Sequence, residues 1–239
     1  MLRPRPVAVA GPLLGAALVA WIVTYQRMRG MDAGPIALGG LAWYLGIWVT
    51  MTAAMMLPAA APMVLVFNRA SVERARHRGL ASAPTWVFVA GYVVAWTAYG
   101  LLAYGVDRGA RAAPHLLAWA QSGRYLPGVA LGAAALYELT PLKDVCLRHC
   151  RGPIHFVHAG WRDGAVGALR MGAEHGLYCV GCCWGLMLAL FALGVMSLTW
   201  MGAIAIVIFV QKVLLLGDRL APLVATTLFA LAAWVVVSA

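Results

Sequence analysis

The chain alternates between long apolar runs and short polar connections, which is the pattern of a membrane protein that crosses the bilayer several times. A spanning helix needs about 20 predominantly apolar residues. Seven runs approach this length, near residues 7–25, 38–67, 84–106, 125–145, 177–197, 199–216 and 220–238. The predicted fold is therefore all-α, a polytopic transmembrane helical bundle with about six to seven spanning helices. No polar block is large enough for a soluble domain, so we treat residues 1–239 as a single transmembrane domain.

Prolines predict where two of these helices bend. Proline removes a backbone donor and clashes with the preceding turn. The run 38–67 is too long for one straight crossing and contains Pro58 and Pro62, so a kink is expected there. Pro141 predicts a bend near the end of the fourth run.

Composition and charge agree with a membrane location. Hydrophobic residues make up 63% of the 239 residues and charged residues only 11%. The net charge of +10 does not indicate nucleic-acid binding, because the Lys and Arg residues lie in short connections between apolar runs. If the chain crosses the membrane seven times, 13 of the 18 Lys and Arg residues fall on one side of the membrane. That side is predicted to face the cytoplasm. The N-terminus is then cytoplasmic.

Three of the five cysteines lie close together in the sequence GLYCVGCCWGLM. Cys179, Cys182 and Cys183 have i, i+3, i+4 spacing, which places side chains on one face of a helix. The same spacing recurs in Cys146, His149 and Cys150. Both sets are expected at the cytoplasmic ends of their helices, where structural disulfides are uncommon. Thiolate and imidazole ligands suit Cu(I) and zinc, so the two sets predict a metal site, for copper first and zinc second.

Methionines extend this pattern. Met187 follows Cys183 by four residues, and Met55 follows Met51 by four in the second run. Thioethers are ligands for Cu(I), although methionine also fills apolar cores without binding a metal. We therefore add Met187 and Met55 to the candidate ligands. The connection between the two cysteine sets is expected to carry four histidines, which are His149, His155, His158 and His175.

One carboxylate, Glu138, lies inside an apolar run, and a charge there needs a partner. We expect a buried pair with Lys143 or Lys212, or a hydrogen bond to Gln211, rather than metal ligation.

Four sequences taken together resemble a known bacterial family. MTAAMMLP, PLKDVCLRHCRGP, GLYCVGCCWGLM and FALGVMSLTWM occur in the order and spacing of the domain of unknown function 2182, described as predicted metal-binding integral membrane proteins. The resemblance spans roughly Trp43 to Lys212. It implies a multi-pass protein of the bacterial cytoplasmic (inner) membrane with a metal site at the matching cysteines. The family pattern has Gln at the position of Glu138 and Glu at that of Gln211, which predicts that these two side chains touch.

Three functions remain open. The favoured one is soft-metal binding for transfer, transport or assembly of a copper enzyme, with the lipid bilayer and a metal donor or acceptor protein as partners. The second is a membrane thiol oxidoreductase that uses the pair Cys179 and Cys182 with a quinone. The third is a non-catalytic subunit of a larger membrane complex. The sequence contains no glycine-rich phosphate loop, so a self-powered pump is not expected.

Overall fold

The computed structural model describes residues 7–28, 40–79, 82–112, 125–193, 197–214 and 217–238. These ranges contain nine helices and no strand. The helices are α1 (Val7–Met28), α2 (Leu41–Arg78), α3 (Thr85–Ala112), α4 (Tyr125–Glu138), α5 (Pro141–Arg151), α6 (Pro153–Ala159), α7 (Gly164–Leu193), α8 (Leu198–Val213) and α9 (Gly217–Ser238). The all-α prediction is confirmed.

Five of the described helices are long and apolar enough to cross a membrane, namely α1, α2, α3, α7 and α9. The helix α8 is apolar but has only 16 residues, which is about 24 Å of helix against a hydrocarbon core of about 30 Å. The predicted span 125–145 is divided between α4 and α5. A polytopic helical bundle is therefore correct, with five full-length candidates among the described residues where about six to seven spans were expected.

The break between α4 and α5 has a local cause. Thr140 is extended, with φ −80° and ψ 146°, and its hydroxyl caps α5 by accepting from the Lys143 backbone N–H at 3.4 Å. Pro141 occupies the first turn, where a missing N–H costs no helical hydrogen bond. The bend expected at Pro141 is thus confirmed, and it lets α5 pack against α7 instead of extending α4.

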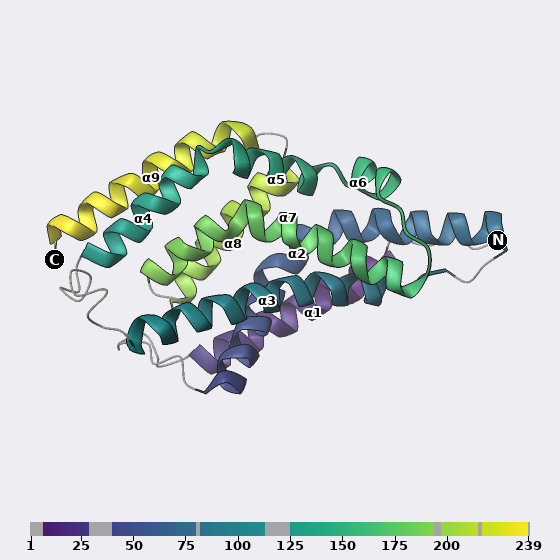
Figure 1. Cartoon of the computed structure of the whole chain (residues 1–239), viewed down its shortest axis with the longest axis horizontal. Coiled ribbons are helices and arrows are strands. Elements are labelled where there is room, and N and C mark those ends of the chain that lie inside the picture. The colour runs from purple at the N-terminus through teal and green to yellow at the C-terminus, as the bar shows by residue number, and fades with distance from the viewer. Residues whose placement is uncertain are drawn as a thin grey trace.

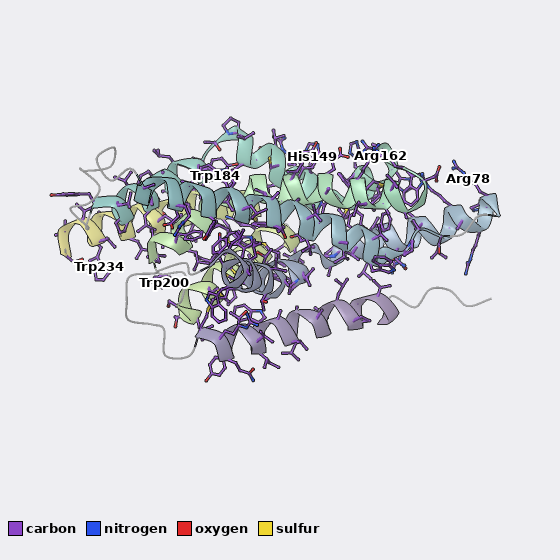
Figure 2. The ribbon with its side chains drawn as sticks, turned by 60° about the horizontal axis from the view of Figure 1, so that its bottom comes forward. Arg78, His149, Arg162, Trp184, Trp200 and Trp234 are labelled. Atoms are coloured by element: carbon purple, nitrogen blue, oxygen red, sulfur yellow. The ribbon has the colours of Figure 1, made fainter. Side chains whose placement is uncertain are left out.

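The second helix continues through its prolines for 38 residues and ends at Gly79, whose φ of 64° forms a left-handed cap. Its ribbon changes direction along its length (Figures 1 and 2), in agreement with the kink expected from Pro58 and Pro62.

The helix α7 lies in the middle of the bundle (Figure 1) and packs against α3, α4, α5 and α8. By contrast, α1 packs on α2, and α9 packs on α4 near the edges. In Figure 2, Arg78 and Arg162 lie toward one end of the molecule, and Trp200 and Trp234 lie toward the other. The apolar outer surfaces suit contact with lipid.

Glycines allow α7 to approach α3 closely. A Cβ added at Gly172 would overlap the Phe88 carbonyl oxygen, and one at Gly91 would overlap the Leu169 carbonyl oxygen. A Cβ at Gly176 would lie 2.6 Å from that of Ala95. Gly172 and Gly176 form a small-xxx-small pattern, which brings helix backbones together in membranes. This contact fixes the central helix against its main neighbour.

Replacing Gly172 with leucine is expected to separate α3 from α7 and to destabilise the fold, because the obstructing atom belongs to the backbone. The predicted cost is about 1–3 kcal/mol or more, measured as a lower midpoint of thermal unfolding in detergent. Gly132→Leu is the matched control, since a Cβ there meets nothing within 4 Å. Equal midpoints for the two variants would contradict the close contact.

Candidate metal centre

Four cysteines form a sulfur cluster where α5 packs against the middle of α7. They are Cys150, Cys179, Cys182 and Cys183, and we use the term sulfur cluster for these four residues. The Sγ of Cys182 lies 3.7 Å from that of Cys150 and 3.5 Å from that of Cys183. The Cys182 Sγ also donates to the Cys179 carbonyl oxygen at 3.3 Å. Side chains from two helices thus meet, which the predicted metal site had assumed.

The position of the cluster along α7 differs from the sequence prediction. The three α7 cysteines lie in the middle of a 30-residue helix and are almost fully buried, not at the cytoplasmic end of a helix. Cys146 and Cys150 lie on the separate helix α5, not at the end of a fourth span. The pair Cys179 and Cys182 therefore lacks the helix N-terminus that activates thiols in redox C-x-x-C motifs, which removes the main argument for the oxidoreductase.

A lysine and a tyrosine hold Cys179. The buried Lys212 of α8 places its Nζ 2.7 Å from the Cys179 Sγ. The Tyr92 hydroxyl of α3 lies 2.9 Å from the same sulfur. A neighbouring cation favours the thiolate, the form of cysteine that binds metals. The sequence indicated that Lys212 needs a buried partner, because it is a lysine within an apolar segment. No sequence pattern pointed to Tyr92.

Four predicted ligands lie outside this cluster, namely Cys146, Met187, Met55 and His149. Cys146 is half-buried and packs against Gly181, where an added Cβ would meet its Sγ at 2.6 Å. Met187 and Met55 are buried in the same hydrophobic core as the α7 cysteines. Their roles as ligands stay predictions.

The predicted ligand His149 turns away from the sulfurs. Its ring stacks on Tyr178, with centroids 4.3 Å apart and an interplanar angle of 5°. Its Nδ1 lies 2.8 Å from the Val145 carbonyl oxygen, one turn earlier in α5, at an exposed position. The i+3 spacing from Cys146 therefore did not bring this imidazole to the cluster.

The remaining histidines of the expected connection divide into two kinds. His155 and His158 are exposed on α6. His175 was expected in the connection as well, but it lies inside α7 and is buried. The error arose because α7 begins at Gly164, 13 residues before the predicted span.

The described residues contain no group of three or more His, Cys, Asp or Glu side chains already arranged to hold a metal ion. The sulfurs lie close together, yet they do not surround a common point. Binding an ion through three or more of them would require their side chains to reorient.

A second polar group lies beside the cluster. Lys143 pairs with Glu138, and its Nζ donates to the Gln211 Oε1 at 3.0 Å. The Gln211 amide donates to the second Glu138 oxygen at 3.0 Å. All three residues are buried. This confirms the expected contact between Glu138 and Gln211 and makes metal ligation by Glu138 unnecessary.

Exchanging the carboxylate and the amide tests this contact. Glu138→Gln leaves the buried Lys143 ammonium without a counter-charge, and breaking a buried pair costs about 3–5 kcal/mol. Adding Gln211→Glu restores a carboxylate next to Lys143. We expect the single variant to lose thermal stability in detergent and the double variant to recover most of it. A double variant as unstable as the single one would show that the two positions are not exchangeable.

Removing the Lys212 charge tests the Cys179 contact. Lys212→Met takes away the cation beside the Cys179 sulfur. If the cluster binds Cu(I) through thiolates, the affinity for the ion is expected to fall about tenfold or more, because the thiolates lose their counter-charge. Lys212→Arg keeps the charge and should lose less. Anaerobic competition with a chromophoric Cu(I) chelator measures both. Wild-type affinity in a folded Lys212→Met protein would rule out this role.

One of three comparisons with known proteins indicates a family connected with copper. No curated protein matches the chain, and no solved structure matches it. A family model described as PpoB2, copper chaperone, matches residues 45–235. This range contains all five cysteines, both buried lysines and most of the helical bundle. The chain therefore belongs to the PpoB2 copper chaperone family.

Proposed function

We propose that the protein carries Cu(I) within the bacterial inner membrane, bound by the sulfur cluster as cargo rather than as a resident cofactor. The observation that carries this proposal is the approach of Cys150 to Cys182 and of Cys182 to Cys183, at 3.7 and 3.5 Å between sulfur atoms. A tetrahedral ion with metal–sulfur bonds of about 2.3 Å holds its sulfurs about 3.8 Å apart. The existing separations are close to that value.

The surroundings favour Cu(I) over harder ions. Thiolates are soft ligands, and the cluster lies in an apolar core without a carboxylate among its contacts. When two or more of the four sulfurs are thiolates, their negative charge exceeds the single positive charge of Cu(I), and the Lys212 ammonium offsets the excess. Zinc remains the second choice, because a thiolate set also suits it.

The absence of a preformed three-ligand site among the described residues suits a carrier. Thiols that must reorient to surround an ion can also release it, as a chaperone must. The proposal requires a protein that donates copper and another that accepts it. The basic end marked by Arg78 and Arg162 in Figure 2 is where we place one of them, on the cytoplasmic side.

Cysteine variants test the proposal. Cys182→Ala removes the sulfur that contacts two others, so Cu(I) affinity is expected to fall by about a hundredfold or more. The matched control is Cys146→Ala, whose sulfur packs against Gly181, and its loss should be much smaller. Copper content after anaerobic loading and chelator competition provide the measurements.

Two results would overturn the proposal. One is a folded Cys182→Ala protein that holds Cu(I) as tightly as the wild type does. The other is a wild-type protein that stays free of copper after anaerobic loading. A larger loss in Cys146→Ala than in Cys182→Ala would move the site toward the first turns of α5.

A further inference from the structure

The helix α7 carries a continuous row of metal-ligating side chains at intervals of four residues. We call this the donor row, and it consists of Met171, His175, Cys179, Cys183 and Met187. All five are between 0% and 3% exposed. Side chains four apart on a helix have Cβ atoms about 5–6 Å apart, and the row covers about 24 Å of helix.

Packing alone accounts for the methionines and cysteines, since both residue types commonly fill apolar interiors. It does not account for His175. The Nδ1 of this buried imidazole has no hydrogen-bond partner. A buried polar atom without a partner is destabilising and calls for an explanation. The other unpartnered buried atoms in the described part of the chain belong to two threonines and a tryptophan, which do not offer an imidazole to a metal.

Aromatic rings enclose His175 and connect it to the sulfur cluster. The rings of Phe88, Tyr92 and Phe156 lie 6.1, 5.6 and 5.7 Å from its own, between centroids. The hydroxyl of Tyr92 also reaches the Cys179 Sγ, at 2.9 Å. Tyr92 of α3 therefore contacts both His175 and Cys179, which are neighbours in the donor row. An ion moving between His175 and Cys179 would stay in surroundings that exclude water.

The row connects the basic end of the molecule to its interior. The Sδ of Met171 accepts a hydrogen bond from the Arg162 backbone N–H at 3.4 Å, and Arg162 lies toward that end in Figure 2. At its other end, Met187 belongs to the same hydrophobic core as Met51, Met55 and Met201. The row thus runs from the surface where α7 begins, through the sulfur cluster, to a methionine-rich interior.

We infer that the donor row is a transfer path for Cu(I), in which His175 is the ligand between the basic end and the sulfur cluster. The inference rests on the proposed copper-carrier function and extends it. The ion remains Cu(I) throughout, and each step exchanges one soft ligand for the next. His175 accepts the ion through the lone pair of Nδ1, in the neutral tautomer that carries its proton on Nε2.

Loading kinetics distinguish a transfer path from a holding site. His175→Phe keeps an aromatic ring in the aromatic surroundings but removes the donor, and His158→Phe at an exposed position is the matched control. Each protein is mixed anaerobically with a chromophoric Cu(I)–chelator complex, and the rate and the final amount of copper transferred are recorded. We expect His175→Phe to load about tenfold or more slowly and to reach the wild-type amount, whereas His158→Phe loads at the wild-type rate.

A wild-type loading rate in His175→Phe would overturn the inference and leave the copper-carrier proposal intact. A normal rate with reduced final copper would also overturn it, because His175 would then belong to the holding site. A wild-type protein that takes up no Cu(I) would overturn both.

A measurement on the wild-type chain covers the case in which the variant fails to fold. Protein labelled with ¹⁵N-histidine is titrated with Cu(I) beyond the capacity of the sulfur cluster. The inference predicts a large shift of the His175 Nδ1 resonance after the cysteines have filled. An unchanged His175 resonance at excess Cu(I) would contradict it.

Discussion

The interior of this bundle depends on two buried lysines, because an ammonium in an apolar interior must have a counter-charge or acceptors close by. Lys143 forms an ion pair with Glu138 and donates a hydrogen bond to Gln211, and Lys212 donates a hydrogen bond to the Cys179 sulfur. Gln211 and Lys212 are neighbours near the end of α8, so one short helix contacts the α4–α5 break on one side and the middle of α7 on the other. The place where α5 meets α7, and hence the sulfur cluster, depends on these two contacts.

The sequence predicts the features that follow from local pattern. The long apolar runs predicted the helical bundle, and Pro141 predicted the bend between α4 and α5. The pairing of Glu138 with Gln211 followed from the need of a buried charge for partners. Other features arise from tertiary packing. Residues 164–176 look like a polar connection, yet Gly172 and Gly176 let them continue α7 against α3, which buries His175.

Residue spacing also fails to predict which side chains of a helix reach its neighbour, because this depends on how the helix is rotated about its axis. The residues Cys146, His149 and Cys150 share one face of α5, but only Cys150 reaches a second sulfur. The ring of His149 stacks on Tyr178, and Cys146 packs against Gly181. Which member of an i, i+3, i+4 set points at a neighbouring helix depends on the crossing of the two helices, and no single-sequence pattern encodes that crossing.

A copper carrier must bind a soft ion tightly enough to exclude competitors and loosely enough to release it. In the proposed carrier, buried thiols beside a lysine would bind the ion tightly, and side chains that reorient around the ion would allow its release. The most direct test is X-ray absorption spectroscopy of the wild-type protein loaded with Cu(I) under anaerobic conditions. The account predicts a first coordination shell made of sulfur. A shell made only of nitrogen or oxygen would contradict the assignment of the sulfur cluster as the copper site.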